Sequence, residues 1–408
     1  MSVAPNDNLT GFESILGVSE RIRRRELSPV SLAEFELERI DRLNPRLNAF
    51  ITVTRDAARE QAVTAERECR SGLNRGVLHG IPIAVKDFYD TAGIRTTAGF
   101  ARFAQRVPAQ NAAMVERLRD AGAVLVGKTN MHRLGSGTTS LESDFGPVVN
   151  PWDAHRVAGG SSGGSAVAVA TGLCFGTVDT DAVGSGRLPA AICGVSCFKP
   201  TYGVLDRSGV LADQAPPDPT IELLAHPCLT ARTAEDVALM FAALAGDRTR
   251  ESPPARRIGV VTNYSATPEI RAAFERYIGV LEAMSMTLIE ATAPFDAARF
   301  DAAAIERDRA DGSRRDFADV DALVLPTLTA RAPTIDEARS QGEQAVSPNN
   351  TFFCNYFGFP AISVPAGELT AGLPFGLQLV GPRGADERIL SLAKAFHRQI
   401  AFQYHGPI

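Results

Sequence analysis

Residues 157–198 have the sequence VAGGSSGGSAVAVATGLCFGTVDTDAVGSGRLPAAICGVSCF, which contains two loops rich in glycine and serine. The first loop, AGGSSGGSA at 158–166, continues directly into an apolar run at 166–173 that predicts a helix. The second, TDAVGSGRLPA at 180–190, places Ser185 between two glycines. Glycine permits backbone conformations that are closed to other residues, so either loop can turn its N–H groups toward an anion or a developing oxyanion. Both loops are therefore candidate sites.

The sequence around these loops alternates short apolar strands with amphipathic helices. IPIAV at 81–85 and AVLVG at 123–127 are typical of strands, and AAMVERLRDAG at 112–122 lies between them with helical periodicity. This alternation indicates βαβ units, a largely parallel sheet and the α/β fold class. The same patterns predict later strands at 256–261, 321–327, 360–367 and 374–381, and helices at 237–246 and 387–400.

The ends of this core have a different character. Residues 10–70 are expected to be helical, because apolar residues recur at helical spacing beneath charged faces. Residues 205–225 are rich in proline and predict an irregular surface excursion. The length of 408 residues allows two or three domains, but a large α/β sheet can accommodate this much chain, so we assume no separate domains.

Composition excludes several classes of protein. The net charge is −5 and no basic block extends beyond Arg21–Arg25, which argues against a nucleic-acid surface. The six cysteines are sparse and the amino terminus has no signal pattern, so we expect a reducing cytoplasm. Cys193 and Cys197 lack a second ligand pair at matching spacing, so no metal is expected. No apolar run reaches the ~18–20 residues of a membrane span.

Lys86 is the first unusual residue, because it ends the apolar strand IPIAVKD where the pattern predicts burial. Burial disfavours the charged form of a lysine and can make a neutral amine available as a base. Only four lysines occur in the chain, so surface cations are mostly arginine. The alternative is a lysine at a strand end that pairs with Asp87 at the surface.

The first serine loop allows more than one interpretation. A phosphate loop is disfavoured, because the Lys-Ser/Thr pair is absent and no strand precedes the loop directly. Gly159–Gly163 also matches G-x-S-x-G, the strand-turn-helix elbow that presents a nucleophilic serine, but the preceding NPWDAHRVA is poor strand. Further along, Ser196–Lys199 matches S-x-x-K without the other motifs of penicillin-binding enzymes, and we treat that match as chance.

Taken together, these segments resemble the amidase signature family. The resembling text includes GVLHGIPIAVKD, AGAVLVGKTNM, AGGSSGGSAVAVATG, GSGRLPAAICGVSCFKPTYGVL, FGFPAISVPAG and GLPFGLQLVGP, and it is densest across 77–205. The resemblance implies a Lys–Ser–Ser triad in which Ser185 is the nucleophile, Ser161 relays protons next to a cis peptide bond, and Lys86 is the base. It also implies one α/β/α domain over 1–408, built around a large mixed sheet, with 1–70 as helical entry segment and 206–408 as the rest of the sheet.

The sequence departs from the family's pattern in four places. The family usually has S-D-T-G-G-S before the nucleophile, whereas this chain has Thr180-Asp181-Ala182-Val183-Gly184-Ser185. A β-branched residue is an outlier at positive φ, so Val183 must have negative φ or distort the loop. GSGR at 184–187 resembles the allophanate-hydrolase branch more than tRNA-dependent amidotransferase subunits. The usual serine-leucine-aspartate is absent around 212–222, and the segment near 290–315 is several dozen residues shorter than in typical members.

The resulting function hypothesis is an amidohydrolase that cleaves a linear carboxamide through an acyl-enzyme on Ser185, without a cofactor. Oxyanion and substrate contacts are expected from Ala182, Val183 and Gly184, with Gly135 and Ser136 from the loop at 132–145. Loops at 205–225 and 290–350 are expected to complete the pocket. The alternatives are a glutamine-amidotransferase subunit that supplies ammonia to a partner, or a catalytically degenerate subunit. We expect a small-molecule amide substrate, neither nucleic acid nor membrane as partner, and a possible homodimer.

Overall fold

The computed structural model describes residues 9–214, 219–246, 253–293 and 300–407. Within these residues the strands form one sheet in the order β1-β3-β2-β4-β6-β5-β10-β11-β9-β7-β8. The strands are β1 (Phe50–Val53), β2 (Pro82–Lys86), β3 (Val124–Thr129), β4 (Gly176–Asp181), β5 (Ser196–Lys199), β6 (His226–Ala231), β7 (Arg257–Val261), β8 (Thr287–Ala291), β9 (Ala322–Pro326), β10 (Ala361–Glu368) and β11 (Pro374–Val380).

The sheet is mixed. Strand β2 runs parallel to β3 and β4, and β7 runs parallel to β8 and β9. The remaining neighbours pair antiparallel. The α/β class with a large mixed sheet is thus confirmed, although the sheet is less parallel than the βαβ pattern alone suggested.

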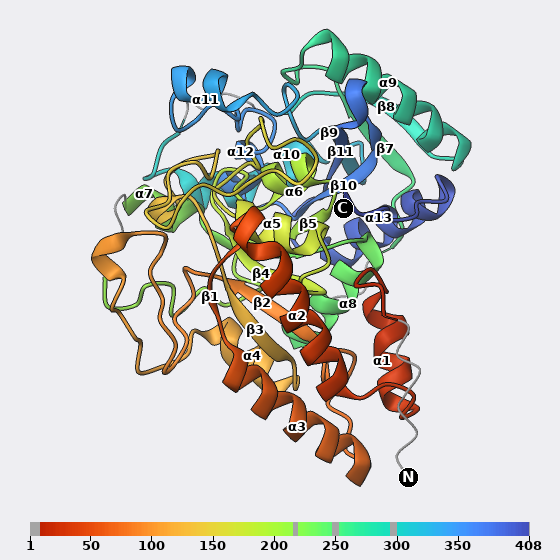
Figure 1. Cartoon of the computed structure of the whole chain (residues 1–408). Helices are drawn as coiled ribbons and strands as arrows, with labels where there is room; N and C mark the ends of the chain where they lie inside the picture. Colours follow the sequence, from red (N-terminus) through yellow and green to blue (C-terminus); the bar gives the residue numbers. More distant parts are fainter. Residues whose placement is uncertain (1–8, 215–218, 247–252, 294–299, 408) are drawn as a thin grey trace.

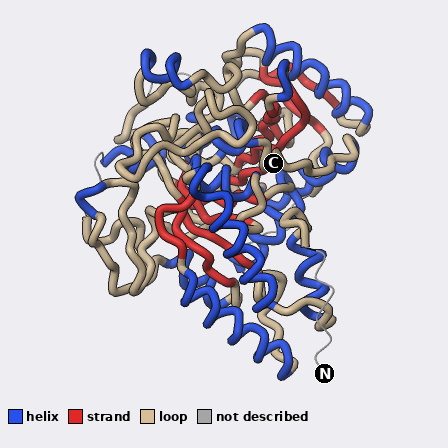
Figure 2. Tube along the Cα trace, viewed as in Figure 1, coloured by secondary structure: helices blue, strands red, loops and turns tan. Residues whose placement is uncertain are grey.

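Helices cover both faces of the sheet (Figures 1 and 2). Apolar side chains of α1, α4, α8, α9 and α13 belong to one core, and those of α3, α5 and α6 belong to the other; α2 contributes Leu32 to the first core and its remaining core residues to the second. The helices are α1 (Ile15–Arg23), α2 (Pro29–Leu47), α3 (Arg55–Ser71), α4 (Ala113–Asp120), α5 (Gly163–Ala170), α6 (Arg187–Cys193), α7 (Pro219–Leu224), α8 (Ala234–Ala245), α9 (Pro268–Ala283), α10 (Ile305–Asp316), α11 (Ile335–Gln341), α12 (Phe352–Tyr356) and α13 (Asp386–Gln399).

Alternation along the central strands decides which side chains meet helix α5. In β2, Ile83 and Val85 belong to the core between the sheet and α8, whereas Ala84 belongs to the core between the sheet and α5. Successive side chains of a strand point to opposite faces, so Lys86 follows Ala84 toward α5. In β4, Val178 belongs to the core of α8, and Asp179 therefore also faces α5.

Two local elements differ from the sequence-based expectation. The entry segment contains β1, which pairs antiparallel with β3 at the edge of the sheet. Its four residues, FITV, are too few to show a period, so tertiary pairing decided their state. Helix α6 follows Ser185 closely although Pro189 lies within it. Proline is tolerated there because the first-turn N–H groups have no partner inside the helix.

Helix α5 approaches the backbone of neighbouring segments closely at Gly164. A Cβ atom built on Gly164 would lie 2.6 Å from the carbonyl oxygen of Ala49 and 2.7 Å from the amide nitrogen of Asn130. Both atoms are backbone and cannot swing away. A side chain at this position would therefore push α5 away from the segments next to β1 and β3.

We predict that Gly164→Ala destabilises the protein by about 1–3 kcal/mol, the usual cost of overpacking a core. The matched control is Gly279→Ala in α9, where no atom lies within 4 Å of the added Cβ. That substitution should stabilise the helix by up to ~1 kcal/mol, because alanine is the better helix former. Chemical denaturation of both variants measures the difference, and equal stabilities would contradict the close-approach argument.

Candidate active site

Lys86 is the last residue of β2 and is fully buried. Its Nζ donates to Ser161 Oγ at 2.7 Å and to Thr180 Oγ1 at 3.0 Å. The surface pair with Asp87 is wrong, because the Asp87 carboxylate lies 3.3 Å from Lys128 Nζ and both of those side chains are buried. The ammonium-to-hydroxyl contact is what a lysine needs to exchange protons with a serine.

Burial lowers the pKa of Lys86 to about 8. Four neighbouring groups oppose that fall: the carboxylates of Asp179 and Asp181 and the thiols of Cys228 and Cys197. A solvated lysine is almost wholly protonated at neutral pH. A lysine with a pKa near 8 is neutral in a useful fraction of molecules under mildly alkaline conditions. Lys86 is therefore a group that can accept a proton in this pH range.

Ser161 lies in the loop before α5, and the Gly160–Ser161 peptide bond is cis. The Ser161 carbonyl accepts from the His132 amide at 2.9 Å, and the Ser162 amide donates to the Ser185 carbonyl at 3.1 Å. The second of these bonds joins the two serine loops, which lie more than twenty residues apart in the sequence. Ser161 faces Lys86 rather than a histidine, unlike the nucleophile of a G-x-S-x-G elbow.

Ser161 and Ser185 line one cavity of about 290 Å³. Within the described residues no hydrogen bond joins the two hydroxyls directly. Gly135 and Ala182 also line this cavity, whereas Ser136, Val183 and Gly184 do not. The Ser136 hydroxyl instead donates to the Arg133 carbonyl at the surface.

The loop before Ser185 is shaped by the Asp181 side chain. Its carboxylate accepts from the Gly184 amide at 2.8 Å and the Gly186 amide at 3.3 Å. Gly184 has a φ of 131°, whereas Val183 is not among the residues with positive φ. The loop thus accommodates valine without strain, and the left-handed conformation falls on glycine.

Hydrogen bonding divides the backbone amides of this loop into two groups. The Gly184 amide is committed to Asp181. Among the hydrogen bonds of the described residues, the amides of Ala182, Val183 and Ser185 donate to no acceptor. These three N–H groups can still donate to an oxyanion, because that stabilisation comes from the backbone and not from side chains.

Asp181 forms a fully buried ion pair with Arg187. The guanidinium Nε and Nη2 lie 2.9 and 3.0 Å from the two carboxylate oxygens. Burial alone would raise the pKa of Asp181, but the Arg187 charge and hydrogen bonds hold it well below its usual range. This carboxylate therefore stays ionised and fixes the loop at any ordinary pH.

Helix α12 supplies contacts that sequence reasoning missed. The Thr351 hydroxyl donates to the Val183 carbonyl at 2.5 Å, and Asn355 Nδ2 donates to the Asp181 carbonyl at 2.7 Å. Both residues lie more than 160 positions downstream of the loop, and nothing in their local sequence marks them. Arg187 is visible in GSGR, but the use of arginine for surface cations in this chain obscures its burial.

The residues that line the cavity come from some, but not all, of the loops that the sequence predicts to form the pocket. Leu134, Gly135 and the segment 207–211 line it, as the loops at 132–145 and 205–225 predict. Residues 215–218 of that excursion lie outside the described residues. None of the described residues of 290–350 lines this cavity, which corrects the expectation for that part of the segment; residues 294–299 lie outside the described residues.

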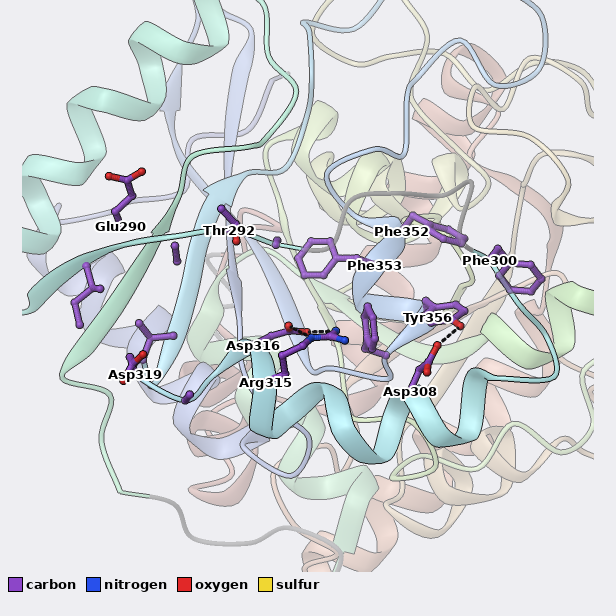
Figure 3. A pocket seen from close by; sticks show the side chains of 16 residues that line it. Glu290, Thr292, Phe300, Asp308, Arg315, Asp316, Asp319, Phe352, Phe353 and Tyr356 are labelled. Carbon is purple, nitrogen blue, oxygen red and sulfur yellow. Dashed lines mark hydrogen bonds and ion pairs between the residues drawn. The ribbon is translucent and has the colours of Figure 1, made fainter.

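Part of that segment walls a second, larger cavity of about 650 Å³ between the end of β8, α10 and α12 (Figure 3). Phe300, Phe352 and Tyr356 line it, and the Tyr356 hydroxyl donates to Asp308 at 2.6 Å. None of the predicted catalytic residues belongs to its lining. Thr351 and Asn355 contact the loop before Ser185 directly, and neither residue lines the cavity that Ser161 and Ser185 share.

Known families, sequences and structures include clear relatives of this chain. The family model described as Amidase matches residues 31–298 and 295–390. A glutamyl-tRNA(Gln) amidotransferase subunit from Thermosynechococcus vestitus is 31% identical, over 94% of this chain and 96% of that protein. The crystal structure of an amidase superposes with a TM-score of 0.81 at 28% identity, over 95% of this chain and 100% of that one. Native peptide amidase from Stenotrophomonas maltophilia gives 0.81 at 25% identity, over 97% and 98%.

The chain belongs to the amidase family, as the amidase signature in its sequence implied. The Thermosynechococcus relative is named as an amidotransferase subunit, which differs from the allophanate-hydrolase branch that GSGR suggested. The alignment with that relative spans 481 positions, more than the 408 residues here, so the relative contains insertions. The two family-model matches meet at residues 295–298, which places the shortening where the sequence located it.

In the described ranges no three His, Cys, Asp or Glu residues form a group that could hold a metal ion. No helix of that same part of the chain is both long and apolar enough to cross a membrane.

The Thr351 hydroxyl anchors the loop before Ser185 through the Val183 carbonyl. Thr351→Val removes the hydrogen bond to the Val183 carbonyl with little change in volume, so the loop loses one anchor. We expect kcat to fall by about 10-fold or more with a smaller change in KM, since the loop acts on the transition state. Steady-state kinetics of the variant measures both constants.

Thr171→Val is the matched control. Thr171 is also buried and its hydroxyl donates to the Val167 carbonyl at 2.7 Å, at the end of α5 away from the loop. It should lose stability without loss of kcat. If Thr351→Val had wild-type kcat, the anchoring role of Thr351 would be wrong.

Proposed function

We propose that this chain cleaves a carboxamide C–N bond by serine-based acyl transfer, with Ser185 as nucleophile, Ser161 as proton relay and Lys86 as base. The observation that supports the proposal most strongly is the 2.7 Å contact between the buried Lys86 Nζ and Ser161 Oγ. Ser161 and Ser185 open on the same cavity, so a bound amide can reach both hydroxyls. A serine needs such an adjacent base to attack a carbonyl.

In the proposed reaction, neutral Lys86 takes the Ser161 proton as Ser161 takes the Ser185 proton, and Ser185 Oγ attacks the carbonyl carbon. The negative oxygen of the tetrahedral intermediate accepts from the free amides of the Ala182–Ser185 loop. Collapse breaks the C–N bond while Ser161 returns a proton to the departing nitrogen. Water then attacks the acyl-enzyme by the same route, which regenerates Ser185 and releases the acid.

This mechanism predicts a pH dependence. Lys86 must be neutral to act as base, and its pKa is about 8. Below that pH the reactive fraction rises about tenfold per unit, and above it the rate reaches a plateau. We therefore expect kcat/KM to increase with pH and level off above about pH 8; a rate that is flat between about pH 6 and 9 would exclude Lys86 as the base.

Ser185→Ala should reduce turnover by on the order of 10⁴–10⁶ without unfolding, because removal of a nucleophile abolishes the step that it performs. A fluorophosphonate probe should label the wild-type chain on Ser185 and leave this variant unlabelled. Lys86→Arg should be as inactive as Lys86→Ala, since a guanidinium does not deprotonate in this range.

Ser71→Ala serves as control for that experiment. Ser71 lies at the end of α3, where its hydroxyl donates to the Glu68 carbonyl far from the cavity. It should keep wild-type labelling. Labelling that persists in Ser185→Ala would remove the nucleophile assignment, and a wild-type chain that is never labelled would favour the degenerate subunit.

The name of the Thermosynechococcus relative supports a second candidate within the same chemistry. That relative is named as an amidotransferase component, which favours a subunit that releases ammonia for a partner over a free-standing amidase. We place this candidate above an independent hydrolase on sequence similarity alone. The similarity to the structure of a peptide amidase also supports a free-standing hydrolase, because one fold can accommodate both activities.

Ammonia release distinguishes the two candidates. The purified chain is assayed with glutamine and with a panel of primary and secondary amides, alone and after co-expression with genes that neighbour its own. A free-standing amidase turns over at least one amide alone. An amidotransferase component shows turnover that depends on a co-purified protein and that favours glutamine.

A further inference from the structure

Asp179 is a buried carboxylate that the mechanism above does not use. It lies on β4, and the parallel register that pairs Val85 with Val178 puts the next residues of the two strands, Lys86 and Asp179, side by side. Both face α5 and both are fully buried. Asp179 Oδ2 accepts from the Thr177 and Thr230 hydroxyls, each at 2.7 Å.

Asp179 differs from the other carboxylates near Lys86, because each of those is paired with a cation. Asp181 is paired with Arg187, and Asp87 is paired with Lys128. Asp179 has hydroxyl partners but makes no ion pair within 4 Å among the described residues, and its Oδ1 has no hydrogen-bond partner there.

Two other titratable groups near Lys86 are neutral. Burial raises the pKa of the Cys228 thiol on β6 well above its ordinary value. His132, in the loop after β3, has a pKa lowered to about 4 by burial and is uncharged at neutral pH. Asp179 is therefore left as the carboxylate that faces the Lys86 ammonium without a cation of its own.

The ionised forms of Asp179 and Lys86 stabilise each other. Burial raises the pKa of Asp179, and the Ser165, Thr177 and Thr230 hydroxyls and the Lys86 charge oppose that rise. The Asp179 charge in turn opposes the fall in the pKa of Lys86. The two charges therefore influence each other across neighbouring strands without direct contact.

We propose that Asp179 is a positioning residue for the reaction proposed above: its carboxylate is the counter-charge of the Lys86 ammonium and sets the pH at which Lys86 becomes a base. This inference rests on the proposed role of Lys86. It assigns to β4 a second function besides carrying the nucleophile loop.

Asp179 acts on the proton affinity of the lysine. Burial lowers the pKa of Lys86, and among the opposing influences the Asp179 charge is the largest. Without that charge the ammonium is less stable, so Lys86 loses its proton at lower pH. A base with lower proton affinity is also weaker, and the plateau rate should fall.

The test is Asp179→Asn, which removes the charge and retains an oxygen that can accept from Thr177 and Thr230. The readout is the rate at which a fluorophosphonate probe labels Ser185 between about pH 5 and 10, which needs no knowledge of the substrate. We expect the acid limb of this profile to move to lower pH by on the order of one unit. The plateau rate should fall in the same variant.

Two controls separate charge from structure. Asp236→Asn makes the same change in a buried carboxylate on α8 that accepts from the Ile15 amide at 2.8 Å, away from Lys86. Its profile should match wild type. Thr230→Val removes a hydroxyl from Asp179 but keeps the charge, so its acid limb should not move to lower pH.

If Asp179→Asn does not fold, Asp179→Ser is the second variant, because it is smaller and neutral and retains a hydroxyl that can accept a hydrogen bond. An acid limb that stays at the wild-type pH in a folded, labelled variant overturns the role of Asp179. Labelling that persists in Ser185→Ala overturns the proposed function instead, so the two failures are distinguishable.

Discussion

The arrangement of the site depends on the buried ion pair between Asp181 and Arg187. Its two members lie six residues apart, and the pair closes the loop that contains Ser185 into a fixed turn. The same guanidinium donates to Gln378 on β11 at 2.7 Å and to Asn355 on α12 at 2.6 Å. Loss of one partner of such a pair leaves an uncompensated buried charge and costs about 3–5 kcal/mol. One interaction therefore connects the loop that contains Ser185 to β11 and α12 in the carboxy-terminal part of the chain.

A second constraint concerns the burial of Lys86 away from solvent. A lysine becomes a base near neutral pH only if it is taken out of water, yet an isolated buried ammonium is costly. The structure meets both conditions with hydroxyl partners for Nζ and carboxylates on the neighbouring strand. Threonine and serine hydroxyls stabilise these groups without adding net charge. The sheet thus provides a low-dielectric environment that still permits proton transfer.

The shortened segment near residue 300 changes which parts of the chain meet. The Thermosynechococcus relative aligns with insertions, and the family model divides at residues 295–298. In this chain, residues within 289–293 and 300–320 line the larger cavity next to α12. None of them lines the cavity that Ser161 and Ser185 share. Helix α12 nevertheless contacts the serine loop through Asn355, and Thr351 does so from the residue just before it. The carboxy-terminal residues influence the site through one short helix.

The sequence alone determined the α/β class, the family and the three candidate catalytic residues, because glycine-serine loops and a lysine at the end of an apolar strand are local patterns. It could not determine β1, whose four residues have no period and pair only because β3 presents a free edge. Nor could it find Asn355, Thr351 or the burial of Arg187, since those contacts join positions more than 160 residues apart. The compensation of Asp181 and Asp87, which leaves Asp179 facing Lys86, likewise depends on which strands become neighbours. Local chemistry is encoded in consecutive residues, whereas the pairing of buried charges follows from strand order and register, which only the folded sheet decides.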